Sequence, residues 1–245
     1  GNVGFDQKLW DVQADEAGNR LTLTTVSPDG EENYPGTLRV KVTYTFTEDD
    51  ELSIRYEAVC DKDTLVNLTN HAYFNLSGEG SGDVKNHEMT IHADAFTAAD
   101  EGLIPTGELR PVAGTVFDLR KPLRIADGLR GLENDIQMQS GKGYDHNFVL
   151  RGAGVKEAAV VYAPDTGIEM RVFTDQPGVQ FYGGNCLEGV NPGKCGRAYA
   201  PMAGLCLETQ RFPDAPNHDN FPSILLKAGE KYDTTTTYAF GVKKA

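Results

Sequence analysis

The sequence lacks long apolar runs, and it has much less positive than negative charge. No stretch approaches the roughly 20 consecutive apolar residues of a membrane span, and we find no signal peptide. With 23 Lys and Arg against 36 Asp and Glu, the formal net charge is −13. This charge argues against nucleic acids and anionic membranes as partners, but it says little about a neutral small molecule.

Cysteine is sparse, and the motifs of metal and nucleophile chemistry are missing. The four cysteines, at positions 60, 186, 195 and 206, form no Cys-x-x-Cys pair, so we expect no zinc site and no other metal or cofactor. A disulfide is possible with four cysteines, but such sparse usage is typical of a reducing compartment. We therefore expect a cytoplasmic protein, with a periplasmic or secreted location left open. No Gly-x-Ser-x-Gly motif is present either.

The sequence is instead rich in short alternating segments separated by turn residues. Leu38–Phe46 alternates apolar and polar side chains, and residues 52–60 repeat the pattern after an acidic turn, which predicts an antiparallel hairpin. The only segment that resembles a helix is residues 125–138, where glycines weaken the pattern. We therefore predict an all-β protein, an antiparallel β-sandwich that forms a single domain over residues 1–245.

Turn residues bound most of the remaining expected elements. An irregular loop is expected at residues 98–109, after a strand at 89–96. Further strands are expected at residues 21–26, 66–76, 111–119, 145–150, 158–162, 168–174, 179–182, 205–210 and 235–242.

Val66–Leu76 has an unusual polar face if it is a strand. Alternation places five polar side chains on one face, and they are amides, a hydroxyl, a phenol and an imidazole rather than Lys and Glu. Such uncharged groups suit a sugar or another polyol, so we expect a carbohydrate site in which His71 transfers protons. The alternative is a hydrogen-bonded sheet surface with a structural histidine. The five residues are Asn67, Thr69, His71, Tyr73 and Asn75.

Polar groups of the same kind occur in two other expected strands and at the start of a third. Glu208 follows Leu205 and Leu207, which point to the opposite face, and shares its own face with Cys206 and Gln210, while Gln180 is flanked by apolar residues. A carboxylate in such a position is costly to bury unless it is partnered, so an ion pair with Arg or Lys is the structural alternative. Asp145 follows a glycine-rich loop, where a turn-capping aspartate is the alternative.

One imidazole, two carboxylates and several amides make a set suited to acid–base catalysis on a sugar. A carboxylate would remove the proton of an anomeric hydroxyl while the imidazole protonates the ring oxygen. Transfers of this kind typically contribute about 10²–10⁴-fold each. The other histidines, at positions 87, 92, 146 and 218, have weaker contexts, and His146 is expected at most to orient its neighbour Asp145.

Four motifs resemble those of the aldose 1-epimerase, or galactose mutarotase, family, and they follow its order along nearly the whole chain. Shorter matches at residues 4–6, 27–32, 103–108 and 117–120 support them. The four motifs are Asn-Leu-Thr-Asn-His-Ala-Tyr-Phe-Asn-Leu (67–76), Gly-Tyr-Asp-His-Asn-Phe (143–148), Gln-Pro-Gly-Val-Gln-Phe-Tyr (176–182) and Cys-Leu-Glu-Thr-Gln (206–210).

The resemblance implies a galactose mutarotase-like β-sandwich that interconverts the α and β anomers of aldohexoses such as galactose and glucose, without a cofactor. It implies that Glu208 is the general base at the C1 hydroxyl and that His71 is the general acid at the ring oxygen. Asp145 and Gln180 would bind sugar hydroxyls. Tyr73 and Asn75, on the face of His71, are the further expected sugar contacts.

The start of the sequence departs from the family pattern, because it begins at the position that follows an active-site histidine in relatives. We therefore expect an N-terminal segment, with its Arg and His, to be missing here: the sequence is a fragment, or another chain supplies the rest, or this is a shortened relative with weakened activity. A homo-oligomer is the alternative expectation for a partner. A non-catalytic carbohydrate-binding domain of the same fold is the main alternative function. A glycoside hydrolase that uses Asp145 and Glu208 is a third.

Overall fold

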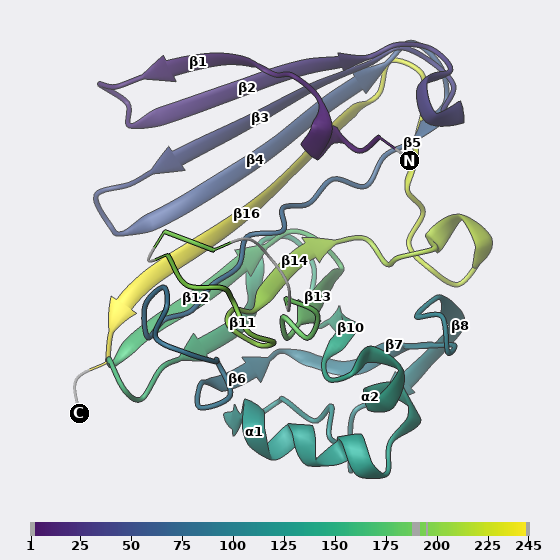
Figure 1. The fold of residues 1–245 in the computed structure, drawn as a ribbon. Helices are drawn as coiled ribbons and strands as arrows, with labels where there is room; N and C mark the ends of the chain where they lie inside the picture. Colours follow the sequence, from purple (N-terminus) through teal and green to yellow (C-terminus); the bar gives the residue numbers. More distant parts are fainter. Residues whose placement is uncertain (1–2, 188–191, 195, 244–245) are drawn as a thin grey trace.

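The computed structural model describes residues 3–187, 192–194 and 196–243, whose strands form two layered antiparallel sheets (Figure 1). In these residues the larger sheet has nine strands in the order β1-β2-β3-β4-β16-β12-β11-β6-β9. The smaller sheet has five, in the order β14-β13-β10-β7-β8. The prediction of an all-β, antiparallel sandwich is confirmed.

The bounds of the elements are as follows. The larger sheet contains β1 (Asp11–Asp15), β2 (Arg20–Ser27), β3 (Leu38–Phe46), β4 (Glu51–Cys60), β6 (Glu88–Ile91), β9 (Leu123–Arg124), β11 (Lys156–Tyr162), β12 (Ile168–Thr174) and β16 (Lys231–Val242). The smaller sheet contains β7 (Ala93–Ala99), β8 (Pro105–Pro111), β10 (Asp145–Leu150), β13 (Gly178–Tyr182) and β14 (Cys206–Gln210). A separate pair joins β5 (Thr64–Leu65) to β15 (Leu225–Leu226), and the helices are α1 (Ile125–Gly128), α2 (Ile136–Gly141) and 3-10 turns at Phe5–Gln7, Glu31–Asn33, Leu129–Glu133 and Ala215–Asn217.

Alternation along the strands places one apolar face of each sheet against the other. Every second residue is buried over residues 38–42 of β3 and 54–60 of β4, and the two strands pair as the predicted antiparallel hairpin. The buried side chains of both sheets form one continuous core. Tyr238 of β16 donates its hydroxyl to the backbone oxygen of Leu207 in β14 at 2.9 Å, which ties the two layers together at the centre of the core.

The prediction of a strand over Val66–Leu76 is wrong. This segment is extended, but its only strand-like pairing among the described residues is an isolated bridge between Phe74 and Leu205. The alternation that suggested a strand is nevertheless kept, because Val66 and Leu76 are buried and Phe74 packs against the core. The segment therefore lies along β14 with sheet-like side-chain directions, but without a ladder of backbone hydrogen bonds.

Two other expectations are also corrected. Residues 105–109, expected in an irregular loop, lie in β8, and of the strand expected over 111–119 only Pro111, the last residue of β8, is in a strand. The helix expected over 125–138 is divided into α1, a 3-10 turn and α2, because Gly128 and Gly131 weaken it and the chain leaves the helical conformation at Asp135. The Asp135 carboxylate then caps α2 by accepting from the backbone N–H of Gln137 and Met138.

The helices and the cysteines bear on whether the chain could span a membrane or form disulfides. No helix within the described ranges has the length and apolar character needed to cross a bilayer. Cys60, Cys186 and Cys206 carry free thiols, and Cys195 lies outside the described residues.

Candidate active site

Three adjacent strands of the smaller sheet bring the predicted polar residues to one hollow. In β13 and β14 Gln180 is directly paired with Glu208, while Asp145 begins the neighbouring strand β10. Their side chains point away from the core because the alternate positions, such as Phe181 and Leu207, are buried in it. His71 closes the hollow from the segment beside β14. The hollow has a volume of about 250 Å³ and is lined by His71, Asp145, Gln180, Tyr182, Glu208, Gln210 and Pro213.

Glu208 is a largely buried carboxyl whose ion-pair partner among the described residues is His71 rather than an Arg or Lys. Its side chain is 12% exposed, and Oε1 lies 3.5 Å from His71 Nε2. Burial, opposed by the nearby imidazole and assisted by the negative charge of Asp145, raises the pKa of Glu208 to about 7. A carboxyl with this pKa exchanges protons readily near neutral pH.

Asp145 and Gln180 are joined by a hydrogen bond. Gln180 Nε2 donates to Asp145 Oδ1 at 2.8 Å, and no partner among the described residues is found for the buried Gln180 Oε1. Burial raises the pKa of Asp145, and the bond from Gln180 and the charge of His71 oppose that rise. The Asp145 side chain therefore faces the hollow and does not cap the preceding turn. Its backbone N–H donates to His146 Nδ1 at 3.1 Å, so His146 orients this residue.

His71 is half exposed, and a thiol and two aromatic rings contact it. Its ring centroid lies 5.0 Å from that of Tyr73 and 5.8 Å from that of Tyr182. Cys206 Sγ lies 3.3 Å from His71 Nδ1. Burial raises the pKa of the Cys206 thiol, as do the charges of Glu208 and Asp145, so the sulfur keeps its proton. The contact at Nδ1 leaves Nε2, the other ring nitrogen, facing Glu208.

The first part of the 66–76 segment is fixed to β14 by side chains instead of a backbone ladder. Asn67 Nδ2 donates to the backbone oxygen of Arg211 at 2.9 Å, and the Arg211 N–H donates back to Asn67 Oδ1 at 3.0 Å. Two residues on, the Thr69 hydroxyl donates to the Thr209 oxygen at 3.0 Å. Asn67 and Thr69, which the sequence placed on a sugar-binding face, thus position His71 relative to the strand that carries Glu208.

Asn75 and Tyr73 have different surroundings from each other. The Asn75 amide nitrogen donates to the backbone oxygens of Gly82 and Ala203 at 3.1 and 3.0 Å, and its oxygen accepts from the Ser77 N–H at 3.0 Å. Both ends of this side chain are therefore engaged by loop backbone, outside the hollow. Tyr73 is 46% exposed and lies against His71, so its ring is available at the rim.

Sequence reasoning missed Asn185, which holds the loop that leads to Asp145. Its amide nitrogen donates to the backbone oxygens of Gly141 and Tyr144 at 2.8 and 2.9 Å. Gly143, between them, has φ +138°, and a β-carbon there would lie 2.6 Å from Asn185 Oδ1, so only glycine fits. No local pattern in the sequence marks this contact. Pro213, at the edge of the hollow, was also not anticipated.

The remaining histidines have structural partners. His87 Nε2 accepts from the Leu76 N–H at 3.0 Å in the core, and His92 Nε2 lies 2.9 Å from a Glu157 oxygen. His218 Nε2 lies 2.9 Å from the Pro105 backbone oxygen. Only His71, among the described histidines, lines the hollow of Glu208 and Asp145.

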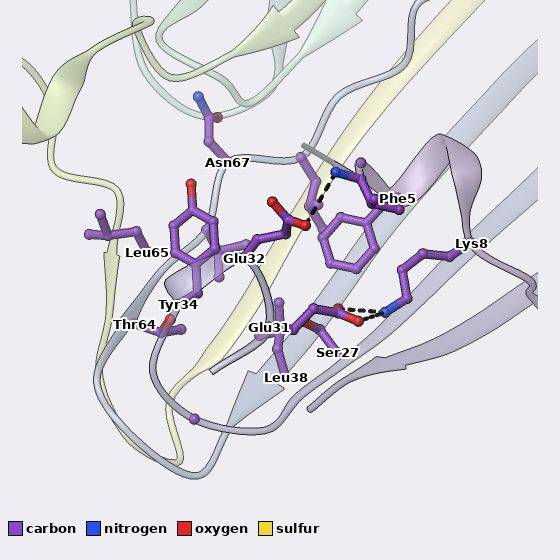
Figure 2. Close-up of a pocket in the computed structure, with 15 residues that line it drawn as sticks. Phe5, Lys8, Ser27, Glu31, Glu32, Tyr34, Leu38, Thr64, Leu65 and Asn67 are labelled. Carbon is purple, nitrogen blue, oxygen red and sulfur yellow. Dashed lines mark hydrogen bonds and ion pairs between the residues drawn. The ribbon is translucent and has the colours of Figure 1, made fainter. Parts of the chain in front are cut away.

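A second hollow of about 220 Å³ lies near the first described residues (Figure 2). Lys8 extends toward Glu31 with Nζ 2.6 Å from Oε1, and the backbone N–H of Val3 donates to Glu32 at 3.3 Å. The ring of Phe5 forms part of the wall. Its lining in the described part of the chain includes no histidine, so it does not offer the acid–base set of the first hollow.

The sequence and the fold are similar to known sugar-modifying proteins. The profile of the aldose 1-epimerase family matches residues 2–239. Galactose mutarotase of Bos taurus is 48% identical over 243 residues, which are 99% of this chain and 68% of that protein. Aldose 1-epimerase of Escherichia coli K12 is 42% identical over 244 residues, or 98% of this chain and 69% of that protein.

Two solved structures superpose closely on this chain. An aldose epimerase homologue from C. elegans gives a TM-score of 0.88 at 28% identity, covering 100% of this chain and 72% of its own. Galactose 1-epimerase from Lactobacillus acidophilus gives a TM-score of 0.84 at 30% identity, covering 99% of this chain and 69% of its own.

Proposed function

Because this chain belongs to the aldose 1-epimerase family, an isomerase family that interconverts sugar anomers, we propose that Glu208 and His71 carry the proton transfers of that reaction. The observation that carries the proposal is the 3.5 Å separation of Glu208 Oε1 and His71 Nε2 at a shared hollow. One side chain can accept a proton while the other donates one within the span of a single pyranose ring.

Glu208 is the general base. Its carboxylate takes the proton from the C1 hydroxyl of the bound aldohexose, galactose or glucose, as the bond between C1 and the ring oxygen breaks. A pKa of about 7 makes the carboxylate a stronger base than an exposed glutamate while leaving much of it ionised at neutral pH. The value supports this role because the base must also return the proton when the ring closes.

His71 is the general acid. When protonated it delivers the Nε2 proton to the ring oxygen, which opens the ring to the free aldehyde. Rotation about the C1–C2 bond presents the other face of the aldehyde. Closure then reverses both transfers, so that Glu208 and His71 regain their starting protonation. The contact from Cys206 Sγ to Nδ1 at 3.3 Å supports the assignment, because it orients Nε2 toward the hollow.

Asp145 and Gln180 bind the sugar hydroxyls. Asp145 offers a carboxylate and Gln180 an unpartnered buried oxygen, and their mutual hydrogen bond limits the rotation of both side chains. Tyr73 and Tyr182 frame His71 and present ring surface to the apolar face of a pyranose. Asn75 is left out of this set because its amide is engaged by backbone. The hollow is smaller than typical pockets for drug-sized ligands, which suits a monosaccharide.

Residues 1–245 act as one domain in this proposal. The support is a single core cluster that contains buried side chains from both sheets. The site itself depends on both layers, since Tyr238 of the larger sheet bonds to the backbone of β14 next to Glu208.

A polarimetric time course on freshly dissolved α-galactose tests the proposed activity. The rate of anomer equilibration should rise in proportion to protein concentration, above the rate in buffer alone. Sugar binding without any acceleration would identify a non-catalytic carbohydrate-binding domain instead. Release of reducing sugar from an aryl galactoside would identify a hydrolase.

A further inference from the structure

Three side chains of different chemistry meet at the hollow: His71 and Glu208 line it, and the Cys206 thiol beside them is fully buried. One nitrogen of His71, the sulfur of Cys206 and one carboxylate oxygen of Glu208 all lie within 4.8 Å of one another. Two contacts among these side chains are shorter, 3.3 Å from Cys206 Sγ to His71 Nδ1 and 3.5 Å from His71 Nε2 to Glu208 Oε1, and they use opposite nitrogens of the ring, of which an ion takes one. Cys206 and Glu208 are two residues apart on the same face of β14, so the strand itself holds them side by side.

This geometry is close to that of a tetrahedral metal site. Zinc binds thiolate at about 2.3 Å, imidazole at about 2.0–2.1 Å and carboxylate at about 2.0–2.2 Å, which places neighbouring ligand atoms about 3.3–3.6 Å apart. The widest separation here exceeds that by about 1 Å. The side chain of His71 is 52% exposed, so a small rotation of its ring can close the difference without repacking the core.

The electrostatic surroundings also favour a cation. Asp145 and Glu208 both face the hollow, and no Lys or Arg is among the described residues that line it. Burial is the main reason why the pKa of Cys206 and that of Glu208 are raised, and the negative charge of Asp145 adds to both shifts. A divalent ion would provide the missing positive charge.

We propose that His71, Cys206 and Glu208 form a binding site for zinc and similar borderline divalent ions, and that an ion bound there blocks anomer interconversion. The mixed thiolate, imidazole and carboxylate set is selective for such metals over Mg²⁺ and Ca²⁺, which prefer oxygen ligands alone. The metal occupies the lone pairs of the two side chains assigned to proton transfer. Zinc and sugar therefore exclude each other from one hollow.

The binding step balances without any redox change. Zn²⁺ enters from solution, the Cys206 thiol loses its proton to solvent, and three bonds form, to sulfur, to one imidazole nitrogen and to one carboxylate oxygen. A water or solvent hydroxide takes the fourth position of the tetrahedron. A chelator reverses the step and returns the proton to sulfur.

Cobalt binding tests the site independently of activity. Titration of the protein with Co²⁺ should produce a thiolate-to-cobalt charge-transfer band in the near ultraviolet, which Zn²⁺ then abolishes by displacing the cobalt. Cys206→Ser should remove the band. Cys186→Ser, which alters an exposed cysteine outside this cluster, should keep it. A missing band, or a band that persists in Cys206→Ser, overturns the proposal.

Inhibition tests the consequence for turnover. Zn²⁺ should inhibit mutarotation at micromolar concentration, EDTA should restore the rate, and added galactose should raise the zinc concentration needed. With each variant compared with its own zinc-free rate, Cys206→Ser should need at least tenfold more zinc, and Cys186→Ser should behave as the parent. Equal sensitivity of Cys206→Ser and the parent contradicts the proposed site. A cobalt band without inhibition keeps the metal site but refutes its overlap with catalysis, and so distinguishes the two proposals.

Discussion

Glu208 Oε1 and His71 Nε2 lie 3.5 Å apart, although their backbones are held in different ways. Glu208 belongs to β14, whose ladder with β13 sets its direction. His71 belongs to an extended segment that is fixed to the same strand by the side chains of Asn67 and Thr69. The relative position of Glu208 and His71 therefore depends on the side-chain hydrogen bonds of Asn67 and Thr69 as well as on the sheet.

Replacement of His71 tests the role of the acid. His71→Asn keeps a polar side chain of smaller size but cannot deliver a proton to the ring oxygen. We expect the turnover number in polarimetric assays to fall by about 10²-fold or more, with galactose binding retained. His92→Asn, at a surface ion pair with Glu157, is the matched control and should leave the rate unchanged. Full activity of His71→Asn would exclude the assignment.

Ionised Glu208 should lower the free energy of unfolding. Its pKa is about 7 in the folded protein against an ordinary value of 4.5, so the folded state binds the proton more tightly and stability declines as pH rises from about 4.5 to 7. Glu208→Gln removes this cost. Urea unfolding should show the variant about 2–3 kcal/mol more stable than the parent at pH 8, and about equal to it at pH 4.

The corresponding control for stability is Glu133→Gln, which changes an exposed residue of a 3-10 turn. It should leave the free energy of unfolding within about 0.5 kcal/mol of the parent at both pH values. A Glu208→Gln variant that is less stable than the parent at pH 8 would show that the ionised carboxylate stabilises the site, in conflict with its raised pKa.

Asp145 should act mainly in sugar binding. Asp145→Asn keeps the shape and can still bond to Gln180, but it loses the charge that a sugar hydroxyl donates to. A hydrogen bond to a charged group is worth about 1.5–3 kcal/mol, so KM for galactose should rise about 10–100-fold while kcat changes less. An unchanged KM with a collapsed kcat would place Asp145 in proton transfer instead.

Asn75 should be structural, contrary to the prediction from sequence. Asn75→Ala leaves the backbone oxygens of Gly82 and Ala203 without their donor, and we expect a loss of about 1–3 kcal/mol in the free energy of unfolding. KM for galactose should stay within twofold of the parent. An increase of tenfold or more with unchanged stability would restore Asn75 as a sugar contact.

Period-two alternation was sufficient to find the polar residues that true strands carry. Gln180 and Glu208 lie in β13 and β14, where every second side chain must face away from the core, so their common face was readable from the sequence. The hairpin of β3 and β4 was predictable for the same reason. His71 was found by the same rule because its segment is extended, although the expected strand does not form.

Alternation could not reveal which polar side chains are already hydrogen-bonded to backbone groups. Asn75 falls on the same face of the alternating pattern as His71, but its amide is hydrogen-bonded to loop backbone. One of these bonds is to Ala203, a residue far along the chain. Asn185, which holds the loop before Asp145, is likewise defined by tertiary contacts. The hydrogen bond from Gln180 to Asp145 required the β10–β13 register, which no local pattern states.

The most direct test of the acid–base account is the polarimetric rate of mutarotation measured from pH 4.5 to 9 for the parent and Glu208→Gln. We predict that the low-pH limb of the parent profile rises through a midpoint near 7, where Glu208 becomes the free base, and that Glu208→Gln is slower by about 10²-fold or more and loses this limb. A flat parent profile down to the pH of acid unfolding, or a Glu208→Gln variant that retains the parent rate, would contradict the account.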